Sequence, residues 1–584
     1  MKIQKLIKLV IAVVLLVSFG SVDLTVANYS PQIPPSIVKD SFINKRNAVD
    51  GPYVPSFGVE TKDFLTLSQV DGGAGEPDNH WVRINGLLWS DVQPDNDQQW
   101  LWDNSLDKKL QDTYDAGMET ILVVRSTPEW ARFHDYFCGP MGPSYLDEFA
   151  DFMAGAVERY SNPPEPYTYT VKFYEIWNEP DDIRQEGLEN NVHGCWGDEN
   201  DEYWGGEYYG DVLQAIYPEV KAANSEAQIV VGGLLLPCDP ATGVDYCNMS
   251  HFFEGILQTD KTDDWPYFDY VAFHGYPYYD PTLSTIQQEI PNDPVGDELY
   301  WPGWNDQGGL VEGKLNFVMS VMLGYEIDKP ILLTECGLTD PNNKASDPAA
   351  LESFEATKAD YLVWLYSRNI ARGINGTIWY YMDSYGWQKS GLLDETNTPL
   401  PAYDAYAVLT SALDGAVYLR DLDNLGDGVL GFEFKKDNRI WVVFSEDDTQ
   451  KTIAEPEWLS SIYDLFGNPV VPTAGEITFN KPIYIEFENA LPVADNQELI
   501  TDEDEPLNIL LTADDVDGDN LTWQIVTPPS NGSLSGTEPD IIYTPDANFN
   551  GIDSFTFIVN DGTVDSNVAT ISITVNAVND APVA

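Results

Sequence analysis

Two glutamate residues stand where strand-like segments of the sequence end, and both are placed to do acid–base chemistry. Residues 173–177 form an apolar run that stops at Asn178 and Glu179, and Pro180 prevents the strand from continuing. A second apolar run ends in the same way at Glu335. A carboxylate at such a place faces a cleft rather than the core. Two of them across one cleft can divide the work, one donating a proton and the other attacking or stabilising positive charge.

The elements that position these carboxylates are eight short apolar runs between residues 50 and 402. The runs alternate with helical segments, one of which repeats apolar residues on a single face from Leu146 through Met153 to Tyr160. Buried strands that alternate with helices are typical of a parallel sheet, and eight repeats predict an α/β fold, a closed (β/α)8 TIM barrel. A doubly wound open sheet is the alternative, but no glycine fingerprint supports it. The expected strands are residues 54–59, 81–88, 120–125, 171–177, 229–236, 270–276, 331–335 and 377–381.

Active sites of parallel barrels lie at the C-terminal ends of the strands, so the residues at those ends form the candidate site. Glu179 ends the fourth strand and Glu335 the seventh. Across a narrow barrel the two carboxyl groups can face each other over one substrate bond, as the hydrolysis of a glycoside requires. The other candidates at or near strand ends are Arg83, Asn178, His274, Tyr276 and Trp379.

The motifs resemble those of clan A glycoside hydrolases, barrel enzymes with an acid/base Glu after Asn on the fourth strand and a nucleophilic Glu on the seventh. Trp177-Asn178-Glu179-Pro180 matches the first motif and Leu333-Thr334-Glu335 the second. The resemblance covers roughly residues 50–490 and is to family 39 or family 5. It implies that Glu179 is the general acid/base, that Glu335 is the nucleophile and that Asn178 binds the sugar 2-hydroxyl.

The resemblance extends to the residues around the pair. His274-Gly275-Tyr276 is similar to a sixth-strand His-x-Tyr motif of the clan, which implies that Tyr276 lies near Glu335. Arg83 is expected to hold Glu335 ionised. The clan retains the anomeric configuration, which implies carboxyl groups about 5–5.5 Å apart.

Several tryptophans are candidate stacking platforms, because the apolar faces of sugar rings suit indole. Each of them can equally well pack in the core or in a loop. The candidates are Trp130, Trp301, Trp304 and Trp379.

Two β-rich segments are expected after the barrel. Residues 403–490 contain short alternating strands and predict an antiparallel β-sandwich. Residues 491–578 contain no Lys or Arg, and their strand-like stretches between Gly, Asn and Asp turns resemble a cadherin-like or immunoglobulin-like repeat of bacterial surface proteins. Pro582-Val583-Ala584 repeats Pro492-Val493-Ala494, so residues 579–584 are predicted to start a further repeat of a longer chain.

The last repeat contains an acidic run that suits calcium, because it places hard oxygen ligands at alternate positions around a Gly turn. The predicted calcium ligands are Glu503, Asp515, Asp517, Asp519 and Asp561, with Asp580 as a further candidate. A solvated acidic turn without an ion is the alternative. No cofactor is predicted for catalysis, since no Cys/His cluster has metal-binding spacing.

The first 27 residues have the pattern of a secretory signal peptide. Lys2, Lys5 and Lys8 precede an apolar run at residues 9–16, and cleavage is expected after Ala27. A membrane anchor is the weaker interpretation, because the run is too short to cross a bilayer. The protein is therefore expected to be secreted. Its net charge of −65 disfavours binding to nucleic acid and to anionic membranes.

Five cysteines fit this expectation of secretion. Cys238 and Cys247 bracket a short loop and can pair, and Cys138 and Cys195 can pair across a common rim. Cys336 then remains as a buried free thiol.

The combined prediction is a secreted retaining glycoside hydrolase that cleaves O-glycosidic bonds of a β-linked oligo- or polysaccharide. We also expect the protein to associate with a cell surface or matrix through its C-terminal repeat. The alternative is a catalytically inactive carbohydrate-binding or adhesive surface protein, against which the presence of both carboxylates argues.

Overall fold

The computed structural model describes most of the chain between residues 57 and 579. The described residues are 57–60, 80–96, 99–133, 138–182, 194–198, 200–240, 245–262, 264–289, 303–341, 343–382, 387–436 and 438–579. The predicted signal peptide, Trp301, Asp580 and all but the first residue of the predicted further repeat lie outside them. Within the described part, no helix combines the length and the apolar character needed to cross a membrane.

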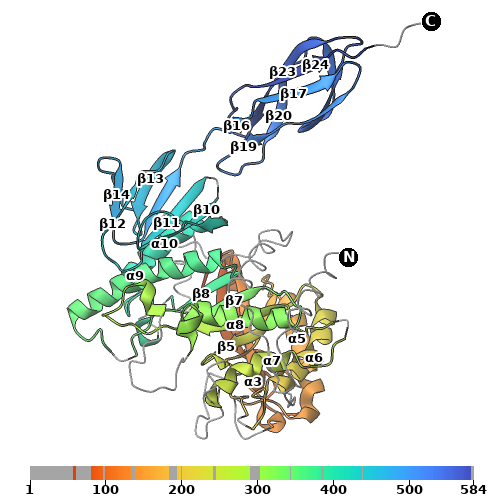
Figure 1. The fold of residues 1–584 in the computed structure, drawn as a ribbon. Helices are drawn as coiled ribbons and strands as arrows, with labels where there is room; N and C mark the ends of the chain where they lie inside the picture. The colour runs from red at the N-terminus through yellow and green to blue at the C-terminus, as the bar shows by residue number, and fades with distance from the viewer. Residues whose placement is uncertain are drawn as a thin grey trace, which may run out of the picture.

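Eight parallel strands close into a barrel, in which each strand pairs with its neighbours in sequence and β1 pairs with β8 (Figure 1). The predicted (β/α)8 barrel is therefore confirmed. Its strands are β1 Phe57–Glu60, β2 Trp81–Leu88, β3 Glu119–Arg125, β4 Phe173–Asn178, β5 Gln228–Leu234, β6 Tyr270–Gly275, β7 Ile331–Cys336 and β8 Gly376–Tyr380.

Helices cover the outside of the barrel and bury the apolar face that their periodicity predicts. In the helix between β3 and β4, Phe149, Met153 and Tyr160 are fully buried. The α-helices are α3 Trp89–Val92, α4 Asn104–Asp115, α5 Leu146–Ser161, α6 Gly206–Ala223, α7 Phe252–Ile256, α8 Leu310–Gly324, α9 Pro348–Ala371 and α10 Pro401–Leu413.

Inside the barrel, an apolar cluster forms a base on which the polar site is built. We call this cluster the barrel floor; it consists of Trp81, Ile121, Phe173, Val230, Tyr270, Ala272, Leu332 and Ile378. The rings of Trp81 and Tyr270 each contact Phe173 edge to face. Because side chains two residues apart on a strand point the same way, the next inward layer begins two positions later. Arg83 follows Trp81 in this way, and Glu175 follows Phe173.

The second domain is an antiparallel arrangement of a five-stranded sheet, in the order β13-β15-β11-β10-β9, and a two-stranded sheet, β12-β14. The first of these strands begins at Val417, and the residues just after the predicted boundary at 403 belong to α10, which packs beside α9. The strands are β9 Val417–Asp421, β10 Val429–Lys435, β11 Arg439–Ser445, β12 Lys451–Ala454, β13 Leu459–Asp464, β14 Glu476–Phe479 and β15 Ile483–Phe487.

This second domain shares a hydrophobic core with the barrel. Trp364 of α9 contacts the rings of Phe432 on β10 and Phe444 on β11. The opposite face of the sheet, which includes Val443 and Ile485, has its own core. Since one face of the sheet is covered by a barrel helix, the two domains are packed as one unit.

The third domain has a separate core and lies on the far side of the second domain from the barrel (Figure 1). A four-stranded sheet, β17-β24-β23-β20, and a three-stranded sheet, β18-β22-β21, form its sandwich, with a small β16-β19 pair. The strands are β16 Val493–Ala494, β17 Gln497–Asp502, β18 Leu507–Leu510, β19 Ala513–Asp514, β20 Thr522–Thr527, β21 Gly532–Thr537, β22 Asp540–Pro545, β23 Gly551–Asn560 and β24 Ala569–Asn576.

Two cations of the second domain bind the acidic turn of the third. Nε of Arg439 donates to Oδ1 of Asp517 at 2.5 Å, and the backbone N–H of Ala490 donates to Oδ2 of the same carboxylate. Nζ of Lys435 donates to Oδ1 of Asp519 at 2.5 Å. The turn between β19 and β20 is therefore a docking contact between the two domains.

Candidate active site

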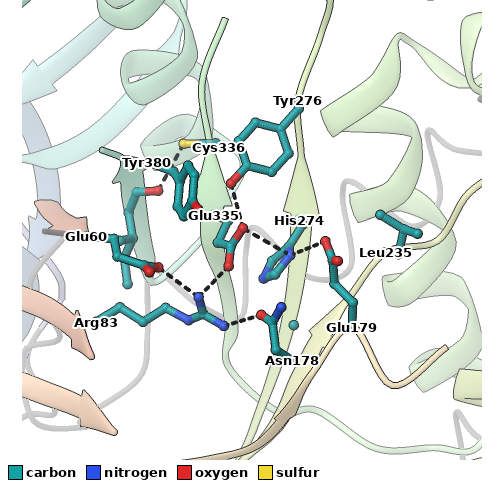
Figure 2. Close-up of polar contacts among 12 residues, drawn as sticks. Glu60, Arg83, Asn178, Glu179, Leu235, His274, Tyr276, Glu335, Cys336 and Tyr380 are labelled. Carbon is teal, nitrogen blue, oxygen red and sulfur yellow. Dashed lines mark hydrogen bonds and ion pairs between the residues drawn. The ribbon is translucent and has the colours of Figure 1, made fainter. Parts of the chain in front are cut away.

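Arg83 is the centre of the polar layer above the barrel floor, and all five of its N–H donors are used (Figure 2). Nε and Nη2 form a two-point ion pair with Glu175, at 3.0 and 2.7 Å. Nη2 also donates to Oδ1 of Asn178 at 2.7 Å. Nη1 donates to Glu60 at 2.8 Å and to Glu335 at 2.5 Å. One buried guanidinium thus fixes groups from strands β1, β4 and β7.

The carboxylate of Glu335 is held at both oxygens. Arg83 donates to Oε1, and the hydroxyl of Tyr276 donates to Oε2 at 2.6 Å. Burial, reinforced by the nearby Glu335 carboxylate, raises the pKa of Tyr276 well above its usual range, so its hydroxyl remains a donor. The two donors orient Glu335 while 9% of its side-chain surface stays exposed.

Glu179 lies beside His274, whose Nδ1 is 2.8 Å from Oε1 of Glu179 and 3.6 Å from Oε2 of Glu335. Burial lowers the pKa of His274, but the carboxylates of Glu335 and Glu179 outweigh it, and the net shift is upward. Figure 2 shows the imidazole between the two glutamates. One carboxylate oxygen from each glutamate and one ring nitrogen lie within 4.8 Å of one another.

The backbone at the end of β4 has an unusual conformation that aims Glu179 into the site. Trp177 and Glu179 have positive φ values of 70° and 47°, which non-glycine residues rarely adopt. The indole N–H of Trp177 donates to the carbonyl of Cys138, which is disulfide-bonded to Cys195 as expected. The backbone N–H of Gly194 donates to the carbonyl of Asn178. A disulfide-linked loop therefore braces the strand end. The pairing of Cys238 with Cys247 and the buried free thiol of Cys336 also match expectation.

A second brace lies beneath Glu179, in the segment that follows β5. Asp181 accepts the backbone N–H groups of Leu235 and Leu236, both at 2.8 Å. The ammonium group of Lys314, from α8, donates to the carbonyls of Leu235 at 2.6 Å and His274 at 2.9 Å. Burial raises the pKa of Asp181 to about 7 and lowers that of Lys314 to about 7. These buried polar groups link the backbones that carry the acid/base candidate and its histidine.

On β8, the aromatic residue that faces the site is Tyr380 and not Trp379, which the sequence predicts to bind substrate. Trp379 has no exposed surface, belongs to the core outside the barrel and donates its indole N–H to the carbonyl of Ser390. It therefore cannot act as a stacking platform in this arrangement. Tyr380 points inward instead, because it lies two positions after Ile378 of the barrel floor, and its ring contacts Tyr276 edge to face.

Trp130 and Trp304, the other predicted platforms among the described residues, contact residues other than the carboxylate pair. Trp130 is partly buried against Trp89 and Tyr145, and its indole N–H donates to the carbonyl of Gln93. Trp304 is fully buried, and its indole N–H donates to the carbonyl of Leu236. Both are held by packing within the barrel domain.

The structure thus brings together Arg83, Asn178, Glu179, His274, Tyr276 and Glu335, all of which the sequence indicates. It adds residues that sequence reasoning missed, namely Glu60, Glu175 and Tyr380. The signal for Glu175 is a lone carboxylate inside an apolar strand, which requires a buried cation. The signal for Glu60 is an acidic residue directly after the first strand-like run.

The five residues predicted to bind calcium do not come together at one place. Carboxylate oxygens of Asp515, Asp517 and Asp519 lie within 4.8 Å of one another, but Asp517 and Asp519 are bound by cations of the second domain. Glu503 is at the opposite end of the third domain, where its backbone N–H donates to Asn576 at the end of β24. The acidic turn and Glu503 are separated by the length of the sheet, so the five-ligand prediction is wrong.

Comparison with known structures shows that the fold is similar to that of glycoside hydrolases. A family 39 glycoside hydrolase from the gut symbiont Bacteroides cellulosilyticus WH2 has a TM-score of 0.51 and 17% identity over 74% of this chain and 81% of its own. A family 30 subfamily 8 xylanase from Clostridium acetobutylicum has a TM-score of 0.46 and 12% identity, over 76% of this chain and 98% of its own. The bifunctional glucanase-xylanase CelM2, from a metagenome library, has a TM-score of 0.47 and 10% identity, over 74% of this chain and 96% of its own.

Sequence comparison describes the third domain. Residues 489–574 match the bacterial Ig domain family, which agrees with the expected immunoglobulin-like sandwich. Integrin beta-like protein B of Dictyostelium discoideum is 33% identical over 112 residues, which is 16% of this chain. The matched part spans only 6% of the length of that relative.

Proposed function

We propose that the barrel is a retaining glycoside hydrolase that cleaves O-glycosidic bonds in a β-linked oligo- or polysaccharide. The observation that carries the proposal is the Glu179–His274–Glu335 group, whose two carboxylates approach within 4.8 Å at their nearest oxygens. That spacing fits the short separation of retaining enzymes, about 5–5.5 Å between carboxyl groups, rather than the about 6.5–9.5 Å of inverting ones.

The two glutamates have different surroundings, which supports different roles. Glu335 is oriented by two donors, Arg83 and Tyr276, which suits an ionised nucleophile that attacks the anomeric carbon. Glu179 is paired with His274, and the carboxylates of Glu335 and Glu179 raise the pKa of this imidazole above its usual value. Glu179 is therefore the group proposed to protonate the leaving oxygen and then to activate water against the glycosyl-enzyme.

The test is a screen of aryl β-glycosides and β-linked polysaccharides, with product sizing, for the wild-type protein and Glu335→Gln. We expect Glu335→Gln to lower kcat by about 10³-fold or more, because the nucleophile is lost. Glu352→Gln, an exposed change on α9, is the matched control. Unchanged turnover in Glu335→Gln would contradict the assignment.

A second experiment tests retention and the role of Glu179. In Glu179→Ala, azide is expected to restore turnover of an activated aryl glycoside and to give a glycosyl azide of retained substrate configuration. This outcome follows because a small anion can enter the space left by the carboxylate and attack the glycosyl-enzyme. Initial release of the opposite anomer by the wild-type protein, followed by NMR, would exclude the retaining mechanism.

We also propose that the protein is secreted and that its Ig-like domain associates with a cell surface or matrix. The two disulfides support an oxidising compartment. Fractionation of the native host, with detection by antibody, tests both parts. Recovery of the protein with the cytosolic fraction would contradict secretion.

A further inference from the structure

A third carboxyl group, that of Glu60, lies beside the nucleophile candidate in a fixed row of side chains. In the barrel register Glu60 on β1 is opposite Tyr380 on β8 and Arg83 on β2. Residues paired in this way on parallel strands point to the same face of the sheet. Figure 2 accordingly shows Tyr380, Glu60 and Arg83 around the same space as Glu335.

Glu60 and Glu335 are equivalent in two respects. Both accept a hydrogen bond from Nη1 of Arg83, at 2.8 and 2.5 Å, and both expose 9% of their side-chain surface. Glu175, the third carboxylate on the same guanidinium, has no exposed side-chain surface. Of the two other carboxyl groups bound to Arg83, Glu60 and Glu175, only Glu60 therefore exposes side-chain surface that a substrate could contact.

We propose that Glu60 is a substrate-binding residue whose carboxyl group accepts a hydrogen bond from a hydroxyl group of the sugar unit attacked by Glu335. This inference rests on the proposed glycosidase function. The shared Nη1 atom keeps the two carboxyl groups adjacent, so a sugar ring in contact with one is within reach of the other. A hydroxyl-to-carboxylate hydrogen bond that strengthens in the transition state adds to catalysis as well as to binding.

The charges around Glu60 indicate which sugars fit. The titratable groups that interact with Glu60 are Arg83 from β2, Arg125 from β3, Glu175 from β4, Tyr276 just after β6, Glu335 from β7 and Tyr380 from β8. Burial raises its pKa to about 7, with Arg83 opposing the shift and Glu335 adding to it. Among the described residues, the carboxyl groups of Glu60, Glu175, Glu179 and Glu335 outnumber the three cationic side chains near them, which are Arg83, His274 and Arg125. A sugar that carries a carboxylate would be repelled, and the proposal therefore specifies an uncharged sugar unit.

The experiment uses the full chain and 2,4-dinitrophenyl β-glycosides of glucose, galactose, mannose and xylose. The monodeoxy derivatives of the glycoside cleaved fastest are then compared in the wild type, Glu60→Ala and Glu60→Gln. We expect Glu60→Ala to lower kcat/KM for the parent glycoside by about 10- to 100-fold, the effect of one hydrogen bond to a charged group. For one monodeoxy glycoside the same substitution is expected to cause no further loss, since the partner hydroxyl is already absent.

Glu60→Gln provides a second measurement that a merely structural role would not affect. The glutamine amide keeps an oxygen that can accept a hydrogen bond from Arg83, but the side chain cannot ionise. An ionisation near pH 7 should therefore disappear from the pH profile of kcat/KM for this variant. If Glu60→Ala does not fold, the deoxy-glycoside comparison is made with Glu60→Gln, which preserves the size of the side chain. Melting curves of both variants establish folding.

The inference is overturned if Glu60 substitutions leave kcat/KM unchanged, or if they lower it by the same factor for the parent and every monodeoxy glycoside. Preferential cleavage of a β-glucuronide over the uncharged glycosides would also overturn it. These results are distinct from failure of the proposed function. If Glu335→Gln abolishes turnover while Glu60 variants behave as the wild type, only the inference on Glu60 fails. If the wild type cleaves no glycoside, both fail.

Discussion

Arg83 and Glu175 form a two-point ion pair inside the barrel, and neither side chain exposes any surface. Replacing Glu175 by Ala leaves two N–H donors of a buried guanidinium without partners. We expect the free energy of unfolding to fall by about 3–5 kcal/mol, the usual cost of removing one member of a buried ion pair. Urea denaturation measures this effect, with the exposed change Glu352→Ala as control. A loss no larger than that of the control would contradict the structural role of the pair.

The Tyr276 hydroxyl has a different part in the site, because it donates a hydrogen bond to the nucleophile candidate. In Tyr276→Phe one donor to Glu335 is lost while the ring and its contact with Tyr380 remain. We expect kcat to fall by about 10- to 100-fold, with little change in melting temperature. Steady-state kinetics and calorimetry measure the two quantities. A large loss of stability with normal kcat in the folded fraction would reverse this interpretation.

The two adjacent aromatic residues of β8 should respond in opposite ways. Trp379→Ala removes a fully buried indole and should cost about 3–5 kcal/mol of unfolding free energy. Tyr380→Ala removes an inward-facing ring at the site and should raise KM by about 10-fold while costing less stability. Denaturation curves and KM values for the pair check the assignment. The prediction fails if Trp379→Ala is the variant with raised KM and unaltered stability.

The pH dependence of stability should contain a contribution from Glu60. Its pKa in the folded protein, about 7, is above the ordinary value of 4.5, so between these pH values the folded state holds a proton that the unfolded state releases. The free energy of unfolding therefore decreases as pH rises from 4.5 to 7. Glu60→Gln lacks this titration, and its stability relative to the wild type should increase over that range by about 3 kcal/mol at most. Parallel pH-dependent slopes for the two proteins would contradict the raised pKa.

The docking contact between the second and third domains gives a test of the calcium prediction. Because Arg439 and Lys435 already bind Asp517 and Asp519, we expect a chelator to leave the thermal transition of the third domain unshifted. Arg439→Gln should instead loosen the domain contact, seen as a larger radius of gyration by X-ray scattering. A chelator-dependent shift in calorimetry of the wild type would restore calcium as a ligand of the turn.

Sequence reasoning succeeds where the signal is local and periodic. Strand-end carboxylates are visible as an abrupt change from apolar to acidic residues, and this change is enough to pair Glu179 with Glu335. Glu175 escapes notice because an apolar run hides a single inward carboxylate whose partner, Arg83, is 92 residues away. Trp379 and Tyr380 differ by one position, and one position decides which face of a strand a side chain takes.

The set of five ligands predicted for calcium is wrong for a related reason. Alternating aspartates define a turn, but the sequence does not show which cations will meet it. Arg439 and Lys435 lie more than 70 residues upstream of Asp517 and Asp519 and reach them only through the packing of two domains. Composition groups Glu503 with the turn, whereas strand pairing places it at the other end of the sheet.

The complete use of the five Arg83 donors restricts how this position can change during evolution. Lysine has three donors and no planar fork, so it would leave at least two of the five acceptor contacts unmet. An uncharged residue would leave three carboxylates crowded together without a cation. Positions 83 and 175 should therefore vary together in related chains, an arginine being lost only where the carboxylate opposite it is lost as well.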